Sequence, residues 1–226
     1  MKKGIAVIAG VVIAMSGFLC AADKPVKAKA KAKVEKAEPA EKTEEAAQTL
    51  KKGDKMELIK IDKGETVAYG ASGDSSKEFV VSLSKEKAEK GKMYSTKAVL
   101  VKGGKGLPIF TRSGGLLKGK RGNWKDYDSL VIKYILEGDK PYSTGMIIAD
   151  EESYGENYAN WNYSSHCDKQ VTLQPGENIL SIDLSALVSN GGRTLDLGNM
   201  RTVSFYGKER EEDCTIYFQS VYVEKE

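Results

Sequence analysis

The pattern of hydrophobic and polar positions divides the chain into two parts. An apolar run at residues 4–19 is interrupted only by Ser16, and residues 23–48 then consist almost wholly of Lys, Ala, Glu, Pro and Val. From Met56 onward, short apolar runs are separated by clusters of Gly, Asn, Asp and Lys, with little sign of a helical period. The second part is therefore expected to fold as strands.

Nine apolar runs are expected to be strands, and several alternate between apolar and polar positions, as at Val171 and Leu173. Residues 174–177, Gln-Pro-Gly-Glu, predict a turn in a tight hairpin, because Pro presets φ and Gly accepts a positive φ. Only residues 85–90 and 185–189 are expected to form brief helical turns. The nine runs are 57–61, 78–83, 95–101, 129–136, 145–149, 170–173, 178–183, 200–206 and 215–223. This pattern predicts an all-β fold, a jelly-roll β-sandwich of about nine strands.

The start of the chain predicts a cleaved secretory signal at residues 1–22. Two Lys follow the first Met, the apolar run comes next, and Cys-Ala-Ala at 20–22 places small residues before the cleavage point. Two alternatives stay open. The run is near the lower limit for crossing a bilayer, roughly 17 to 25 residues, so it would also serve as an uncleaved anchor. Lipidation of Cys20 is the second alternative. A lipoprotein box has a small residue directly before the Cys and an aliphatic residue three before it, whereas this chain has Leu19 and Gly17 at those positions.

Residues 23–53 are predicted to be a flexible, disordered linker rich in Lys, Ala, Glu and Pro. The segment 23–48 has no aromatic residue, so it cannot bury enough apolar surface to offset its chain entropy. The linker is expected to act as a spacer, and a polybasic contact with anionic lipid or polymer is the weaker reading. Residues 54–226 are then the folded domain. The protein is expected to be secreted, periplasmic or in the cell envelope, and to meet a membrane only through an uncleaved signal or a lipid.

The distribution of charge argues against nucleic acid as a partner. The whole chain carries 35 basic and 32 acidic residues, which gives a formal net charge of +3. However, 11 of the basic and 6 of the acidic residues lie in residues 1–53, so residues 54–226 carry 24 basic and 26 acidic residues. With a net charge of −2, the folded part is not expected to have the basic surface that binds nucleic acid.

Two cysteines remain once the signal is removed, Cys167 and Cys214. Because an exported chain meets an oxidising compartment, they are expected to form a disulfide. A redox role is not expected, since no Cys-x-x-Cys spacing is present.

An ordered set of motifs covers most of residues 79–224. They are 81–86 (VSLSKE), 91–92 (GK) with Ser95 entering a strand, 124–130 (WKDYDSL), 173–178 (LQPGEN), 182–184 (IDL), 195–197 (LDL) and 215–218 (TIYF). In order and spacing this set resembles the galactose-binding-like β-sandwich modules, of carbohydrate-binding module type, that are common in secreted bacterial proteins. The resemblance implies a jelly roll, whereas the same scaffold also serves accessory domains of enzymes and adhesion proteins.

Several of these motif residues are expected to have structural roles. Trp124 and Tyr127 bring large apolar area to the start of a strand and are expected to plug the core there. Asp183 and Asp196 each adjoin an apolar residue and are expected to form turns by accepting backbone N–H groups.

No cofactor is expected, with a structural calcium ion as the alternative. Modules of the resembling family usually carry an Asp after the aromatic residue of the last strand, where this chain has Gln219. The acidic runs 150–152 and 209–213 offer oxygen ligands but lack the alternating spacing of a dedicated calcium loop. They are expected to be solvated loops, and no metal-binding residues are assigned.

The segment 153–163 is the strongest candidate for a binding site, because it mixes four aromatic residues with Asn, Gly and Glu. Aromatic faces stack on the C–H face of a pyranose, and amides and carboxylates bind its hydroxyls. The alternative is a long strand that buries Tyr158, Asn160 and Asn162 on one side and Trp161 and Tyr163 on the other. The predicted ligand residues are Tyr154, Glu156, Tyr158, Asn160, Trp161, Asn162 and Tyr163.

Catalysis is not expected. His166 is the only His and lies beside Cys167, and neither Gly-x-Ser-x-Gly nor His-Glu-x-x-His is present. A glycosidase with two carboxylates stays open, because the separation of the carboxylates in space decides it. The predicted function is an exported, non-catalytic carbohydrate-binding module for a poly- or oligosaccharide. The alternative is a cell-envelope or extracellular structural protein that binds a protein partner through the same face.

Overall fold

The computed structural model describes residues 50–67, 79–105, 117, 119–156, 159–207 and 209–226. The predicted signal at 1–22 and most of the predicted linker at 23–53 lie outside the described residues, as does Tyr158. In the described part, no helix has the length and apolar character needed to cross a membrane.

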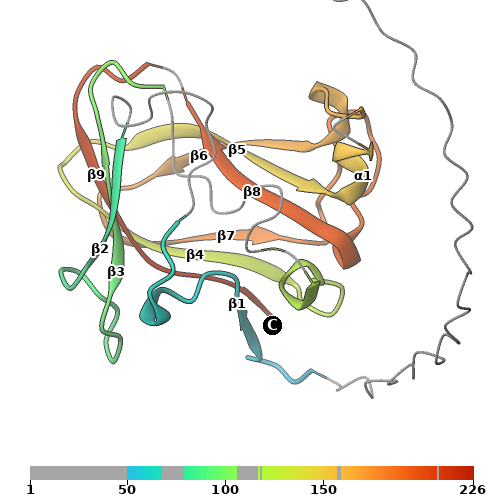
Figure 1. The fold of residues 1–226 in the computed structure, drawn as a ribbon, viewed down its shortest axis with the longest axis horizontal. Helices are drawn as coiled ribbons and strands as arrows, with labels where there is room; N and C mark the ends of the chain where they lie inside the picture. The colour runs from blue at the N-terminus through green and yellow to red at the C-terminus, as the bar shows by residue number, and fades with distance from the viewer. Residues whose placement is uncertain (1–49, 68–78, 106–116, 118, 157–158, 208) are drawn as a thin grey trace, which may run out of the picture. The chain divides into compact units, whose positions relative to one another are not determined.

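In the described residues, nine strands form two antiparallel sheets (Figure 1). Sheet A has the strand order β2-β3-β9-β4-β7, with β1 paired to β9, and sheet B has the order β6-β5-β8. The strands of sheet A are β1 Lys55–Glu57, β2 Phe79–Ser84, β3 Ser95–Leu100, β4 Ser129–Leu136, β7 Gly176–Asp183 and β9 Cys214–Glu224. Those of sheet B are β5 Tyr142–Asp150, β6 Cys167–Leu173 and β8 Met200–Tyr206. The predicted β-sandwich is confirmed.

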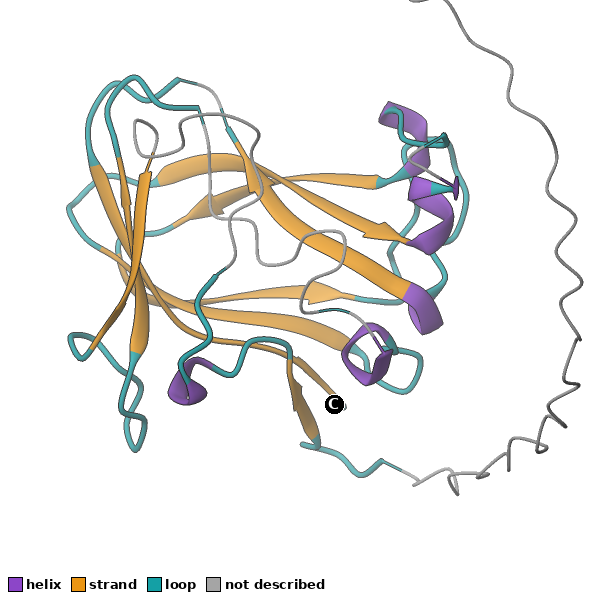
Figure 2. Cartoon of the chain, viewed as in Figure 1, coloured by secondary structure: helices purple, strands orange, loops and turns teal. Residues whose placement is uncertain are grey.

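Helical structure is confined to short elements between strands (Figure 2). They are the one-turn helix α1 Glu151–Tyr154 and the 3₁₀ turns η1 Ile61–Lys63, η3 Gly119–Gly122, η5 Tyr163–Ser165 and η6 Leu197–Asn199. The helical turns predicted at 85–90 and 185–189 are wrong, because both segments are turns without helix. Lys87 has φ of +54°, which is incompatible with a right-handed helix, and the Asp183 carboxylate accepts from the backbone N–H of Ser185.

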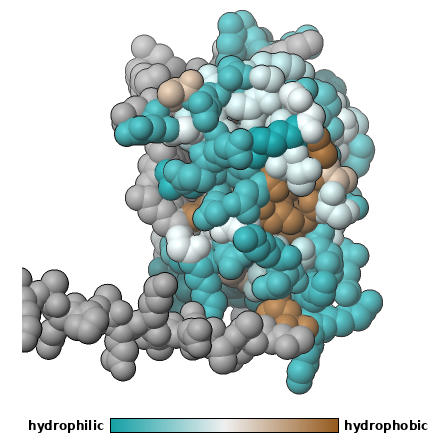
Figure 3. Space-filling model, turned by 90° about the vertical axis from the view of Figure 1, so that its right-hand side faces the viewer, coloured by the Kyte–Doolittle hydropathy of each residue, from teal (hydrophilic) through white to brown (hydrophobic). Residues whose placement is uncertain are grey.

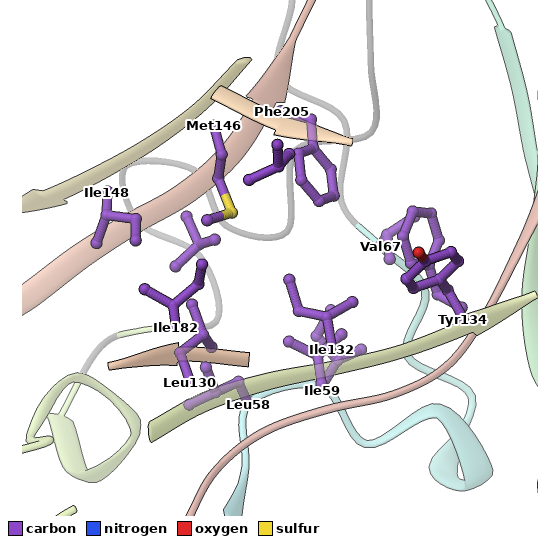
Figure 4. Close-up of a cluster of buried hydrophobic side chains, with 14 of the residues drawn as sticks. Leu58, Ile59, Val67, Leu130, Ile132, Tyr134, Met146, Ile148, Ile182 and Phe205 are labelled. Carbon is purple, nitrogen blue, oxygen red and sulfur yellow. The ribbon is translucent and has the colours of Figure 1, made fainter. Parts of the chain in front are cut away.

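The core lies between the two sheets. Leu130 and Ile132 of β4 project toward Met146 and Ile148 of β5 and toward Phe205 of β8 (Figure 4). Alternation along each strand produces this arrangement, since every second side chain points to the same face. The strands β4 and β8 begin and end at the residues that the sequence predicts.

The turn at residues 174–177 connects the two sheets. Gly176 has φ of +81°, as the turn chemistry requires, and Tyr134 accepts a hydrogen bond from the backbone N–H of Gln174 through its hydroxyl, at 2.9 Å. However, β6 belongs to sheet B and β7 to sheet A, so the expected hairpin between them is wrong. A local turn signal fixes the bend but does not fix which strands pair afterwards.

The predicted structural roles of the motif residues are confirmed. Trp124 is fully buried, and its indole N–H donates to the backbone oxygen of Arg121 at 2.7 Å. Tyr127 is partly buried and packs against the same core. Asp196 accepts from the backbone N–H of Gly198 at 2.9 Å, as a turn-forming Asp does.

The predicted disulfide between Cys167 and Cys214 is wrong, because both are free thiols. Cys167 pairs with Ile148 at one end of β5, whereas Cys214 lines the same groove as Tyr142, at the other end of that strand. Six residues along a strand span roughly 20 Å, and a disulfide needs Cα atoms within about 7 Å of each other.

The loop between β2 and β3 covers part of the outer face of sheet A. Tyr217 points outward from β9 and donates through its hydroxyl to Glu86 at 2.8 Å. Gln219 donates to the backbone oxygen of Lys87 at 3.0 Å, and Glu89 forms an ion pair with Lys133 of β4 at 2.5 Å. The Tyr217 side chain is consequently buried.

Candidate functional site

The outer face of sheet B is polar and continuous across its three strands. Met146 and Ile148 of β5 face the core, so Gly145 and Ile147, which alternate with them, lie on the outer face. Residues that are paired in register lie on the same face. Gly145 pairs with Gln170 of β6 and Tyr206 of β8, and Ile147 pairs with Asp168 of β6 and Ser204 of β8. Ser143 and Thr172 also pair there, with their hydroxyl oxygens 3.0 Å apart.

The ring of Tyr206 lies across the middle of this face. A Cβ atom added to Gly145 would be 2.1 Å from Cζ of Tyr206, so the ring lies directly against the backbone of β5. Its hydroxyl donates to Asp168 at 2.5 Å and accepts from the amide of Gln170 at 3.2 Å, both on β6. Burial, together with the hydrogen bond to Asp168, raises the pKa of Tyr206 to about 12. One side chain thus spans all three strands of sheet B.

The predicted ligand segment connects β5 to β6 at one end of this face, where Figure 1 shows α1. It contains α1, turns and η5, so the alternative of one long strand is wrong. Figure 3 faces this end of the molecule and shows a mainly hydrophilic surface with small hydrophobic areas.

Asp150 fixes the start of this segment. Its fully buried carboxylate caps α1 by accepting from the backbone N–H of Ser153, and it forms a bidentate pair with Arg193 at 2.7 and 2.8 Å. The backbone N–H of Asp196 also donates to it, at 2.7 Å. Burial alone would raise its pKa, but these hydrogen bonds, foremost those from Arg193, lower the pKa of Asp150 to about 2. The carboxylate is therefore ionised and immobile at neutral pH.

Four rings gather at this end of the sheet. Trp161 stacks on His166 with ring centroids 4.7 Å apart and an interplanar angle of 20°. Tyr154 lies 4.8 Å from Trp161 on one side, and Tyr163 meets His166 edge-on at 6.3 Å. His166 is buried, whereas Trp161 is 38% and Tyr163 is 71% exposed. Burial lowers the pKa of His166, so this ring is a neutral support for the two exposed rings.

Tyr154 joins the ring cluster to the sheet, because its hydroxyl hydrogen-bonds to the Thr202 hydroxyl on β8. Thr202 lies on the same face as Ser204 and Tyr206 by alternation along β8. The exposed rings of Trp161 and Tyr163 therefore border the outer face of sheet B rather than a separate surface.

The predicted amide ligands hold the loop. Asn162 caps η5 by accepting from Ser164, and its amide N–H donates to the backbone oxygen of Asn160 at 2.8 Å. Asn160 donates to the backbone oxygen of Glu152 at 3.1 Å and packs against Gly155. Glu156 is exposed. The structure thus brings Tyr154, Trp161 and Tyr163 together and engages both amides within the segment.

A groove of about 710 Å³ lies at the opposite end of sheet B. It is formed by the β4–β5 loop and the β8–β9 loop, and Gly145, Gln170 and Tyr206 of the outer face also line it. The groove and the ring cluster are therefore two ends of one surface, with Tyr206 between them.

The sequence analysis did not identify Tyr206, Asp168 or Gln170 as candidates. Alternation along 200–206 places Tyr206 on the polar side of its strand, but the sequence does not show that this strand neighbours β5. The role of Gly145 becomes clear only from the strand pairing that places Tyr206 opposite it.

Within the described residues, no group of three or more His, Cys, Asp or Glu side chains is placed to hold a metal ion. The carboxylates at 150–152 are engaged by arginines: Asp150 and Glu152 contact Arg193, and Glu151 contacts Arg201 at 2.9 Å.

Comparison with known proteins identifies the fold. No protein-family model and no curated protein matches the sequence. Among solved structures, the family 11 carbohydrate-binding module of a cellulosomal cellulase of Clostridium thermocellum is 10% identical, with a TM-score of 0.50, and the match covers 78% of this chain and 97% of that one. A family 30 module from a cellulosomal cellulase of the same organism is 12% identical, with a TM-score of 0.41, covering 65% and 83%. An exo-beta-agarase is 11% identical, with a TM-score of 0.47, covering 66% of this chain and 22% of the enzyme.

These results define the class of fold. The chain has the β-sandwich of carbohydrate-binding modules, as the motifs in its sequence indicate. At this level of identity the likeness concerns the fold, and the function must be argued from the surface of this chain.

Proposed function

We propose that the protein is an exported, non-catalytic carbohydrate-binding module that holds a poly- or oligosaccharide on the outer face of sheet B. The observation that carries the proposal is the pair of exposed rings, Trp161 and Tyr163, fixed on a buried His166 at the edge of a polar sheet face. The shared fold with a carbohydrate-binding module supports it.

The proposed contacts follow from the chemistry of a pyranose, which has apolar C–H faces and a polar rim. Trp161 and Tyr163 supply stacking surfaces, and their positions are fixed before the ligand arrives, so little side-chain entropy is lost on binding. Glu156 and Gln170 are exposed and supply hydroxyl contacts. Asn160 and Asn162 contribute by holding the ring-bearing segment, and Tyr154 by anchoring it to β8.

A binding role at the ring end of this face is supported by the state of two titratable groups there, His166 and Asp150. His166 is buried beneath Trp161, and the buried Asp150 is locked to Arg193. Neither is placed to exchange a proton with a ligand in solvent. Export is proposed from the apolar run at residues 4–19, and the linker would let the module reach an extended polymer.

Binding to a glycan array tests the proposal. Trp161→Ala is expected to weaken binding to the retained glycan by about 10-fold or more, because stacking area is lost from an exposed ring. The matched control is Ile179→Ala, which removes a side chain 63% exposed on β7 of sheet A and is expected to leave affinity unchanged.

Three outcomes would contradict the proposal. One is that wild-type protein retains no glycan at millimolar concentration. A second is equal loss of affinity in both variants. The third is stoichiometric co-purification with a protein partner without glycan retention, which would favour the structural-protein alternative.

A further inference from the structure

The groove at the end of sheet B opposite the ring cluster has the size and floor of a ligand site. Its volume of about 710 Å³ lies within the roughly 300 to 1,000 Å³ typical of small-molecule pockets. Tyr142 and Tyr206 line it, and the Tyr206 ring lies over Gly145 at its floor. Because Tyr206 also belongs to the outer face of sheet B, a chain-like ligand on that face would run into the groove.

The groove is strongly acidic. Among the described residues, six carboxylates line it against two basic side chains, a formal charge of −4 in a domain whose residues 54–226 carry −2. The six are Glu137, Asp139, Glu209, Glu211, Glu212 and Asp213, and the two basic side chains are Lys140 and Arg210. The negative potential of the folded part is therefore concentrated at this groove.

The two basic side chains leave a net negative charge on the described lining of the groove. Arg210 is buried and donates to the backbone oxygen of Val101 at 3.1 Å, away from solvent. Lys140 forms an ion pair with Glu212 at 2.9 Å. Glu137, Asp139 and Glu211 are exposed and form no salt bridge within the described part of the chain.

We infer that this groove extends the glycan-binding surface and selects sugars that carry an ammonium group, such as glucosamine units. The inference rests on the proposed function, because the carboxylates alone would not specify a sugar. The rings of Tyr142 and Tyr206 accept the pyranose, and the unpaired carboxylates accept its charged amine. An acidic polysaccharide would be repelled, because its charges would face carboxylates across a partly enclosed groove.

Four β-1,4-linked tetramers test the inference, since they differ only in one substituent: glucose, N-acetylglucosamine, glucosamine and glucuronic acid. Affinities are measured by calorimetry at about pH 6, below the ordinary pKa of an amine. The glucosamine tetramer is expected to bind about 10-fold more tightly than the glucose tetramer, which is the size expected from a few solvent-accessible charge contacts. The glucuronic acid tetramer is expected not to bind.

Two double variants with the same change in charge locate the effect. Asp139→Asn with Glu211→Gln removes two exposed groove carboxylates and is expected to abolish the preference for glucosamine while leaving affinity for the glucose tetramer within about 2-fold. Asp126→Asn with Glu57→Gln removes two exposed carboxylates away from the groove lining and is expected to keep the preference.

The outcomes separate the inference from the proposed function. Equal affinity for the glucose and glucosamine tetramers overturns the inference and leaves the proposed function standing. A preference for glucosamine that survives in the Asp139→Asn, Glu211→Gln variant also overturns the inference. So does equal competition by tetralysine, because the carboxylates would then bind a polycation that is not a sugar. Failure of all four tetramers, and of the glycans of the array, overturns the proposed function together with the inference.

Discussion

At the scale of single residues, the position of one glycine shapes the candidate surface. Gly145 allows the Tyr206 ring to lie against β5, and the ring then reaches Asp168 on β6 with its hydroxyl. A side chain at position 145 would lift the ring off the sheet. The flat polar face across three strands therefore depends on the absence of a Cβ atom at one place.

Gly145→Ala is expected to displace Tyr206, because the new Cβ atom would be 2.1 Å from Cζ of that ring. Losing the hydrogen bond to Asp168 is expected to cost about 1 kcal/mol of stability in denaturant unfolding at neutral pH. Ser143→Ala, also on the outer face, is the control and is expected to change stability by less than about 0.5 kcal/mol. Equal stability of Gly145→Ala and wild type would show that the ring is not held by this contact.

The titration of Tyr206 gives a second readout of the same variant. Its pKa is raised to about 12 from the ordinary value of 10.0, so the neutral phenol is favoured in the folded protein. The stability it contributes is fully present below about pH 10 and is lost as the pH rises through about 12. In Gly145→Ala this alkaline loss of stability is expected to shrink, as it should in Tyr206→Phe. An unchanged alkaline profile in both variants would contradict the assignment.

At the scale of elements, the ring-bearing segment is irregular yet firmly held. α1 is a single turn and η5 is three residues long, so neither is stable by itself. Asp150, Arg193 and the Asn162 cap fix the segment instead, through hydrogen bonds to backbone groups at several points. Rigid presentation of Trp161 and Tyr163 thus depends on a buried ion pair rather than on regular secondary structure.

Asp150→Asn is expected to lower stability at neutral pH by about 2 kcal/mol or more, because the Arg193 guanidinium loses its carboxylate partner. The pKa of Asp150 is depressed from 3.8 to about 2, so its contribution is present above about pH 4 and is lost as the pH falls through about 2. Wild-type protein is therefore expected to lose about 2 kcal/mol relative to the variant over that interval, measured by thermal unfolding between pH 2 and pH 7. Parallel acid profiles for both proteins would refute this role.

At the scale of the whole molecule, the two sheets present unequal outer faces. The β2–β3 loop covers part of sheet A through contacts with Tyr217, Gln219 and Lys133. Sheet B keeps a polar face with rings at one end and an acidic groove at the other. The arrangement leaves one extended surface suited to a chain-like ligand, which is why both proposals concern sheet B.

The stability of the fold is expected not to depend on a disulfide. Cys167 and Cys214 lie in different sheets, and burial raises the pKa of both thiols, that of Cys214 to about 11. Both thiols should therefore react slowly with alkylating reagents in the native state and readily once unfolded. A reductant is expected to leave the unfolding temperature unchanged, and intact mass should show both cysteines reduced. A mass lower by two hydrogens, with a reductant-dependent unfolding temperature, would contradict the structure.

Most of the fold could be predicted from the sequence, because alternation of apolar and polar residues is a local property. Eight of the nine expected strands correspond to observed strands in the described residues, whereas the strand expected at 57–61 is wrong, since β1 Lys55–Glu57 shares only Glu57 with it. Trp124 and Asp196 have the roles that their local chemistry implies. The aromatic segment at 153–163 also stood out by composition, and the structure places Trp161 and Tyr163 at the surface.

Pairing and position were decided only by the tertiary structure. The turn at 174–177 was evident from Pro and Gly, yet the strands on either side of it belong to different sheets, because pairing depends on contacts between distant residues. The same applies to the two cysteines. A pair of cysteines predicts a disulfide, but Cys167 and Cys214 lie too far apart to form one. It applies equally to Tyr206 and Gly145, which are 61 positions apart and form one surface only because β5 and β8 are neighbours. The sequence by itself determined the strands and the turns, since these follow from neighbouring residues, and the packing of the sheets determined where a ligand can bind.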